Sequence, residues 1–315
     1  MNLYPDLRLY HFQLELELKH GREALPAYLG STFRGMIASS FRQLVCITQA
    51  PVCDGCILLS HCAYPYMFET FAPVDLPKPL QKRFQQAPRP YIFDVPLAYQ
   101  GESTLTLGLT LVGKAIDYLP YFIYAIEEAS KKQGLGKSRV PYHLTKVTSC
   151  AGSDAAVIFD AERGVVSEAV QPITLNDLYD QSDTDVDELT LEFLTPLRIK
   201  KYGKIQKDES RINFYLFMNL LLGRLDSLSL FHFTHQWAPN CTLRELAREV
   251  EVSAMDLHLQ KLQRYSTRRE QKLSLDGLVG KITFRGPLRQ FLPILKMGTY
   301  VHVGAGTAFG LGKYR

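Results

Sequence analysis

The stretch FQLELELK, residues 12–19, alternates apolar and polar side chains. A period of two predicts a β-strand with one face on a hydrophobic core and the other in solvent. Apolar side chains then recur at steps of three and four between Leu25 and Leu44, which predicts an amphipathic helix with Pro26 in its first turn. A strand that leads directly into such a helix is typical of a layer in which helices cover one face of a sheet.

The same order recurs along the chain. Leucines alternate over residues 105–111, which predicts a strand. An apolar stripe from Ile116 to Ile126 at helical spacing then predicts a helix that ends near Gly134, and residues 142–148 again have a strand pattern. In the second half the pattern predicts strands at 189–193, 281–285 and 300–303 and helices at 209–225 and 243–262. The sequence therefore predicts an α+β fold in each half.

An acidic segment separates the two halves. Residues 176–188 carry six acids in thirteen positions with little periodicity, as in a linker or exposed loop. A chain of 315 residues is long enough for two domains of ordinary size. We therefore expect an amino-terminal domain at residues 1–175, with a cysteine-rich insertion at about 46–100, and a carboxyl-terminal domain at 186–315.

The composition indicates a globular protein without a membrane-spanning part. Hydrophobic residues make up 46% of the chain and charged residues 22%, which excludes a disordered or fibrous protein. The first 19 residues lack the basic start and apolar block of a signal peptide. The longest apolar run, residues 214–222, is far shorter than the roughly 20 residues that a span requires. We expect a cytoplasmic protein with no membrane partner.

The positive charge lies in the second half of the chain. Residues 187–315 contain 20 Lys and Arg against 12 Asp and Glu, a net +8, whereas the first 186 residues contain 16 against 20, a net −4. A basic domain attracts polyanions, because binding them releases counterions. This distribution favours a nucleic-acid ligand.

The chain ends in a glycine-rich segment, VGAGTAFGLGKYR, at residues 303–315. Glycines let backbone N–H groups approach phosphate oxygens, so a phosphate cradle is one interpretation, and a tight turn beneath a sheet is the other. The spacing matches neither a Rossmann nor a Walker motif. GLGKSR at residues 134–139 matches GLGKYR at 310–315 in five of six positions, which indicates an internal duplication because both follow the last expected helix of their half.

Four of the six cysteines fall in one short block, at Cys46, Cys53, Cys56 and Cys62. A C-x2-C pair with outlying thiols suits tetrahedral zinc, and a reducing compartment disfavours disulfides. His61 is an alternative ligand, and an iron–sulfur cluster is an alternative occupant. Because four protein ligands leave no open position on the metal, we expect a structural zinc ion and no catalytic metal.

Several stretches together resemble the CRISPR-associated RAMP endoribonucleases, which process precursor CRISPR RNA. They are YLGSTFRG at 28–35, the cysteine block through Phe68 and Glu69, GTYVHV at 298–303 and the terminal loop from Gly304. The resemblance covers both halves, and the terminal loop is its most specific motif. It implies tandem ferredoxin-like (RAMP, RRM-like) domains, CRISPR repeat RNA as a partner, and other CRISPR-associated interference subunits as further partners.

The resemblance also implies the reaction. An RNA 2′-hydroxyl attacks the adjacent phosphate without a catalytic metal, leaving a 2′,3′-cyclic phosphate, which calls for a base, an acid and cations over the phosphorane. Many family members supply a tyrosine, a histidine and a lysine around the first helix, but this chain has no histidine between residues 31 and 46. The catalytic residues predicted here are Tyr28, Arg34 and His20, with His11 as an alternative histidine. Tyr28 as an aromatic residue that caps the helix against the sheet is the competing interpretation.

The residues expected to contact RNA are basic or glycine: Arg42, Arg264, Arg268, Arg269, Lys313, Gly304, Gly306, Gly310 and Gly312. The run KLQRYSTRR at 261–269, followed by Lys272, combines cations and hydroxyls with Tyr265. Such a run suits contacts with the RNA backbone and base stacking. A solvated charged surface is the alternative.

Two other functions compete with RNA cleavage. Residues 242–245 match a capping box, and the apolar residues over 246–262 are spaced as in the helix-turn-helix motif of a DNA-binding regulator. Glu251 at the turn and the acids around it oppose DNA binding. The other competitor is a non-catalytic RAMP subunit that stays bound to guide RNA in an interference complex, and only the presence of cleavage distinguishes it from the endoribonuclease.

Overall fold

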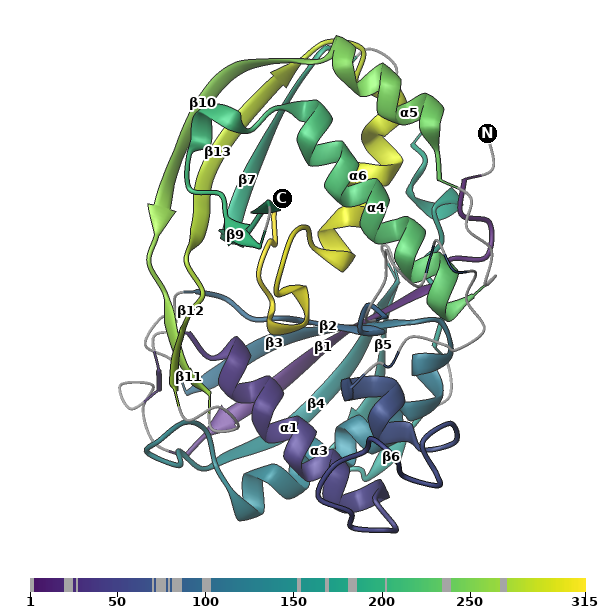
Figure 1. Cartoon of the computed structure of the whole chain (residues 1–315). Helices are drawn as coiled ribbons and strands as arrows, with labels where there is room; N and C mark the ends of the chain where they lie inside the picture. Colours follow the sequence, from purple (N-terminus) through teal and green to yellow (C-terminus); the bar gives the residue numbers. More distant parts are fainter. Residues whose placement is uncertain are drawn as a thin grey trace.

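The computed structural model describes residues 3–19, 25–26, 28–69, 71, 78, 80, 87–97, 103–151, 154–167, 170–180, 186–201, 203–233, 239–266 and 271–315. Two larger sheets organise these residues, one below the other in Figure 1, and helices cover one face of each sheet. Two large clusters of buried hydrophobic side chains lie between the sheets and their helices. The carboxyl-terminal residues run between the two halves.

The first sheet has a ferredoxin-like core. Its strands are β1 (Leu9–Leu18), β2 (Tyr91–Asp94), β3 (Thr104–Val112), β4 (Tyr142–Ala151), β5 (Asp154–Asp160) and β6 (Val165–Val166). They pair antiparallel in the order β2-β3-β1-β4-β5-β6. Helices α1 (Gly30–Val45) and α3 (Leu119–Lys132) follow β1 and β3 and pack side by side on one face (Figure 1). The order β2-β3-β1-β4 with these two helices is the ferredoxin-like arrangement.

The second sheet repeats this arrangement. Its strands are β7 (Glu188–Leu197), β10 (Glu251–Gln260) and β13 (Gly277–Arg285), paired antiparallel in the order β10-β13-β7. Helix α4 (Phe214–His232) follows β7, and α6 (Leu292–Val301) follows β13. On the open edge of β7, Phe193 forms an antiparallel bridge with Tyr314. The end of the chain therefore takes the place of a fourth strand, and the protein has tandem ferredoxin-like folds.

Short elements complete the described structure. Two small hairpins are β8 (Lys200–Lys201) with β9 (Lys204–Ile205), and β11 (Gln263–Ser266) with β12 (Gln271–Ser274). A short helix, α5, covers Cys241–Leu246. Short helical segments occur at Pro65–Glu69, Gly113–Tyr118, Asn176–Leu178, Glu209–Arg211, Ala247–Glu249, Arg289–Phe291 and Thr307–Phe309. The β11–β12 hairpin extends from the second sheet alongside α1 of the first half (Figure 1).

The two similar segments, residues 134–139 and 310–315, also have similar backbone conformations. Gly134 and Gly310 both have positive φ, +68° and +89°. Gly136 and Gly312, two residues further on, have φ of +73° and +75°. The leucine between each pair is fully buried. The two copies therefore make the same left-handed turn after the last helix of their half, which supports the predicted duplication.

The helix predicted over residues 243–262 is wrong for most of its length. Only α5 is helical there, its first turn is capped by Asn240 instead of a capping box at 242–245, and residues 251–260 form β10. The strand has an irregularity between Val252 and Ala254 that shifts its phase. Because of this bulge, apolar residues on one face of a strand are spaced as on a helix. Residues 242–262, all of which the structure describes, therefore do not form the predicted helix-turn-helix motif.

Other boundaries also differ from those predicted. Residues 300–301 end α6 and are not a strand, because packing in the second core outweighs the β propensity of Tyr300 and Val301. Helix α4 begins at Phe214, where the Asn213 side chain accepts a hydrogen bond from the Leu216 amide. The expected insertion at 46–100 contains β2, an edge strand of the first sheet, so only part of that range is additional to the fold.

Helix α4 is long and apolar enough, by length and composition, to cross a membrane. Its most hydrophobic 18-residue window is 61% buried inside the molecule, which is the situation of a core helix. Phe214, Phe217 and Leu221 from this helix are fully buried in the second core. We therefore interpret α4 as the central helix of the second half.

Candidate nucleic-acid interface

The glycine-rich carboxyl terminus, residues 302–315 and here named the terminal segment, is packed between the two halves (Figure 1). On one side, the Ala305 amide donates a hydrogen bond to the Arg198 carbonyl at 2.8 Å. On the other side, a Cβ at Gly310 would lie 2.7 Å from the carbonyl oxygen of Phe93 in β2. The segment therefore fixes the second half of the protein against the first sheet.

The four predicted glycine contacts have different environments. Gly310 and Gly312 are buried, and a Cβ at Gly312 would lie 1.8 Å from the Val303 carbonyl oxygen. These two glycines are required by close packing of backbone on backbone, and their contact with RNA stays a prediction. Gly304 and Gly306 are half-buried, with φ of +90° at both, and a Cβ at Gly304 would lie 2.7 Å from the Arg198 carbonyl oxygen.

Tyr28 lies directly beneath this segment. Its side chain is 4% exposed, and its hydroxyl donates a hydrogen bond to the Phe309 carbonyl. It packs with Leu311 and with Leu262, which precedes β11. This placement agrees with the competing interpretation of Tyr28 as a residue that positions α1, and its catalytic role stays a prediction.

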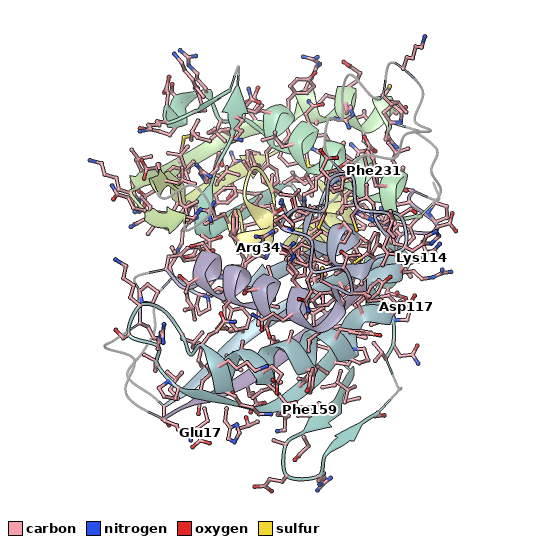
Figure 2. The ribbon with its side chains drawn as sticks, turned by 60° about the horizontal axis from the view of Figure 1, so that its bottom comes forward. Glu17, Arg34, Lys114, Asp117, Phe159 and Phe231 are labelled. Atoms are coloured by element: carbon pink, nitrogen blue, oxygen red, sulfur yellow. The ribbon has the colours of Figure 1, made fainter. Side chains whose placement is uncertain are left out.

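Two arginines from different halves approach the Phe309 ring. The guanidinium carbon of Arg34, on α1, is 5.9 Å from the ring centroid, and that of Arg264, on β11, is 4.7 Å away. The Arg34 Nε donates to the Tyr91 hydroxyl at 3.0 Å. Figure 2 shows Arg34 at the point where α1 faces the terminal segment. The structure thus brings together two residues that were predicted separately, Arg34 as catalytic and Arg264 as RNA-binding.

A third arginine, which the sequence analysis missed, lies beside them. Arg89 donates from Nε to the Phe68 carbonyl at 3.2 Å, and Arg34 donates to the same oxygen at 3.3 Å. Burial, together with the neighbouring Arg34 charge, lowers the pKa of Arg89 below its usual value. We name Arg34, Arg89 and Arg264 the arginine cluster. A lone arginine before a short edge strand carries no sequence signal that could have identified Arg89.

Arginine guanidinium groups in a partly buried site suit the binding of a phosphate group. Each guanidinium presents a planar set of N–H donors that matches the oxygens of phosphate. Low solvent exposure strengthens such contacts, because water screens the charge less. The half-buried Phe309 ring adds an aromatic side chain of the kind on which nucleotide bases stack. The arrangement fits a segment of single-stranded RNA.

The other basic residues predicted to bind RNA are not part of the arginine cluster. Lys313 forms an ion pair with the Asp94 carboxylate of β2 and thereby joins the two halves. Arg42 donates to the Ala50 carbonyl and lies 5.4 Å from the Tyr64 ring, next to the cysteines. His20, Arg268 and Arg269 lie outside the described residues.

Two histidines have lowered pKa values, and one of them, His302, is the first residue of the terminal segment. His302 is 1% exposed, and burial lowers its pKa to about 3. The alternative histidine, His11 on β1, contacts the Thr110 hydroxyl through Nδ1 at 3.0 Å, and burial also lowers its pKa. Both imidazoles are therefore neutral near pH 7, but the burial of His302 keeps it from contact with RNA.

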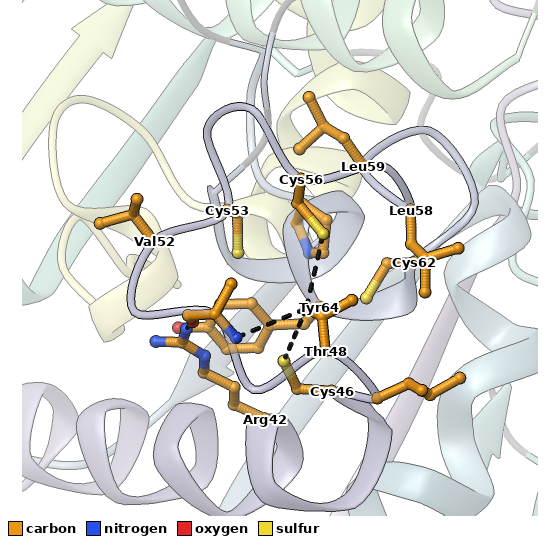
Figure 3. Close-up of a pocket in the computed structure, with 13 residues that line it drawn as sticks. Arg42, Cys46, Thr48, Val52, Cys53, Cys56, Leu58, Leu59, Cys62 and Tyr64 are labelled. Atoms are coloured by element: carbon orange, nitrogen blue, oxygen red, sulfur yellow. Dashed lines mark hydrogen bonds between the residues drawn. The ribbon is translucent and has the colours of Figure 1, made fainter.

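The structure brings the four predicted zinc ligands to one pocket. Cys46, Cys53, Cys56 and Cys62 border it, and Arg42 lies at its edge (Figure 3). Among the residues that the structure describes, no three His, Cys, Asp or Glu side chains are gathered closely enough to hold a metal ion as they stand. The zinc assignment thus stays a prediction.

Family comparisons agree with this architecture. The family model AF_1859_N, an N-terminal domain, matches residues 7–171, and the model of the CRISPR-associated endoribonuclease Cas6 matches residues 191–314. An uncharacterized protein of Archaeoglobus fulgidus is 24% identical over 312 residues, which are 96% of each chain.

Solved structures show the same fold. A product complex of a Cas6 protein from Thermus thermophilus superposes with a TM-score of 0.57 at 18% identity, covering 98% of each chain. A partial Cas6-RT-Cas1–Cas2 complex superposes with a TM-score of 0.57 at 13% identity, covering 98% of this chain and 46% of the other. With the AF_1859_N model over residues 7–171 and the Cas6 model over residues 191–314, on tandem ferredoxin-like folds, the chain belongs to the AF_1859_N family, and its carboxyl-terminal half is similar to the CRISPR-associated endoribonuclease Cas6.

Proposed function

We propose that this protein cuts CRISPR repeat RNA where α1, β11 and the terminal segment meet. The observation that carries the proposal is the convergence of Arg34 and Arg264, from opposite halves, on the Phe309 ring. Two cations that meet only when both halves are docked can hold one phosphate between the domains. The product complex of a Cas6 protein with this fold supports the choice of an RNA substrate.

The proposed step needs no catalytic metal. The RNA 2′-oxygen forms a bond to the adjacent phosphorus, and the bond from phosphorus to the 5′-oxygen breaks, which leaves a 2′,3′-cyclic phosphate and a 5′-hydroxyl. A base takes the 2′-hydroxyl proton and an acid gives a proton to the leaving oxygen. The arginine cluster stabilises the negative charge that develops on the phosphorane oxygens.

The RNA path is expected to follow the β11–β12 hairpin. This hairpin extends beside α1 (Figure 1), and its residues belong to the basic run that begins at Lys261. Arg264 on β11 is the described member of that run at the arginine cluster. RNA held between the hairpin and α1 would place its backbone at the cluster. A cytoplasmic location and assembly with other CRISPR-associated proteins belong to the same proposal, the latter because a complex with Cas1 and Cas2 shares the fold.

Cleavage without metal provides the test. The purified protein is incubated in excess EDTA with CRISPR repeat RNA from its own genome, and with the same RNA carrying a 2′-deoxy group at the cut. We expect cleavage of the first RNA, a cyclic phosphate on the 5′ fragment, and no cleavage of the second. Cleavage of the deoxy substrate would exclude the 2′-hydroxyl mechanism.

A non-catalytic RAMP subunit is the second candidate function. It is favoured by one observation, the absence of histidine from α1, whose sequence is GSTFRGMIASSFRQLV. In that case the repeat RNA binds tightly and stays intact in the same assay. Because tight binding and cleavage are measured on one sample, a single experiment separates the two functions.

A further inference from the structure

We propose that Cys46, Cys53, Cys56 and Cys62 together bind one Zn²⁺ ion, which holds residues 46–62, here named the cysteine loop, in shape. The four residues border one pocket, and Figure 3 shows their thiols around Thr48 and Tyr64. The Thr48 hydroxyl is 3.6 Å from the Cys56 sulfur and 4.0 Å from the Cys46 sulfur. The proposal does not depend on RNA cleavage.

The central pair of cysteines has the backbone of a metal-binding turn. The Cys56 amide donates to the Cys53 carbonyl at 3.1 Å, which closes a tight turn over the C-x2-C sequence. Gly55 in this turn has φ of +74°, a conformation that favours glycine. Such a turn presents two thiols to the same side, as tetrahedral coordination requires.

The outer two cysteines are attached to ordered backbone. The Cys46 amide donates to the Arg42 carbonyl at 2.9 Å, so Cys46 directly ends α1. The Cys62 amide donates to the Leu58 carbonyl at 2.9 Å, and Cys62 leads into the helical turn that begins at Pro65. A metal bound to all four thiols would therefore tie the turn between Cys53 and Cys56 to the end of α1 and to the helical turn at Pro65.

The cysteine loop lacks a hydrophobic core of its own. None of the residues 46–62, all of which the structure describes, is buried. The apolar side chains Ile47, Val52 and Ile57 are 83%, 56% and 89% exposed. A segment of this size without buried side chains requires another source of stability, and zinc is the usual one where cysteines supply it.

The charge at the pocket also fits zinc. Four thiolates and one Zn²⁺ ion carry a formal charge of about −2. Arg42 lies at the edge of the pocket, where its guanidinium offsets part of this charge. This gives Arg42 a role that differs from the predicted contact with RNA.

Zinc binding would draw the sulfurs together. In the described residues no three potential ligands are close enough to hold an ion as they lie. The thiols would have to approach one another, and the lack of buried side chains in the cysteine loop leaves little packing to oppose this movement. The proposal thus couples metal binding to folding of the loop, as in other small cysteine-based sites.

The test measures metal content and loop order on the full chain. Protein purified without chelator is analysed for metals, and we expect about one zinc ion per chain. Cobalt-substituted protein should show the thiolate charge-transfer and d–d absorption bands of a tetrahedral site. Limited proteolysis should cut between Cys46 and Cys62 after zinc is removed with a chelator, and adding Zn²⁺ back should restore protection.

Variants make the test specific. Cys53→Ser with Cys56→Ser should abolish metal binding, whereas Cys150→Ser and Cys241→Ser, at the two isolated cysteines, should leave it unchanged. Metal-free protein whose loop resists proteases equally with and without Zn²⁺ would overturn the proposal. Iron with acid-labile sulfide at the same cysteines would overturn it in favour of an iron–sulfur cluster.

Discussion

Tyr28, two residues before α1, donates its hydroxyl hydrogen to the backbone carbonyl of Phe309 in the middle of the terminal segment. This bond joins the first helix of the chain to its last residues. It also holds the start of α1 against the terminal segment, which carries the Phe309 ring that Arg34 and Arg264 approach. Together with the Lys313–Asp94 ion pair, this bond therefore holds the terminal segment against the first half.

Tyr28→Phe separates positioning from chemistry. We expect the variant to lose about 1 kcal/mol of unfolding free energy, the usual worth of a hydrogen bond, and to keep cleavage within about tenfold of the native rate. The measurements are denaturant unfolding and single-turnover cleavage. A loss of more than a hundredfold in cleavage with unchanged stability would instead restore the predicted catalytic role of Tyr28.

Arg34→Ala tests the arginine cluster. We expect the single-turnover rate to fall by about a hundredfold, because one charged donor to the phosphorane is lost. Arg34→Lys should recover only part of this loss, since an ammonium group lacks the planar fork of donors. Arg211→Ala is the matched control, because Arg211 is exposed and pairs with Asp208. Equal cleavage rates for Arg34→Ala and Arg211→Ala would show that Arg34 does not contribute to cleavage.

The sequence predicted those parts of the fold in which local pattern and tertiary role agree. The alternation at residues 12–19 and 105–111 became β1 and β3, and the helical stripe after Leu25 became α1. The β10 strand could not be predicted, because its bulge near Val252 gives a strand the spacing of a helix. Pairing with β13 decides its conformation, and that partner lies far along the chain.

The candidate site was predictable only in part. Arg34 and Arg264 were each identified from local sequence, but their approach to one ring depends on the docking of two halves. Arg89 carries no motif at all. The glycines were interpreted as phosphate ligands, whereas at Gly310 and Gly312 the structure requires glycine for backbone packing. Composition cannot distinguish these two uses of glycine.

Gly310→Ala tests the packing of the terminal segment. Alanine at φ of +89° is strained, and its Cβ would lie 2.7 Å from the Phe93 carbonyl oxygen. We expect a loss of about 2 kcal/mol or more in unfolding free energy together with weaker RNA cleavage. Gly35→Ala is the control, since nothing lies within 4 Å of a Cβ there. That substitution should stabilise α1 by up to about 1 kcal/mol. A Gly310 variant as stable as the native protein would contradict the packing role.

His302 should make the folded state sensitive to acid. Burial lowers its pKa from 6.5 to about 3, so the unfolded chain takes up a proton between these values while the folded chain does not. Stability is therefore fully present above pH 6.5 and is lost as the pH falls toward 3, by up to about 1.4 kcal/mol for each pH unit. The lowered pKa of His11 acts in the same direction.

His302→Asn removes this titration and keeps a polar side chain. Because φ of +58° with ψ of 169° strains histidine and asparagine alike, the two proteins are compared by how their stability changes with pH. The measurement is denaturant unfolding of both proteins at pH 7.5 and pH 5.5. We expect the native protein to lose about 1 kcal/mol more than the variant on acidification, since one fewer proton-binding group distinguishes the unfolded from the folded state. Equal losses in the two proteins would show that the pKa of His302 is the same in the folded and unfolded states, and would contradict the lowered value.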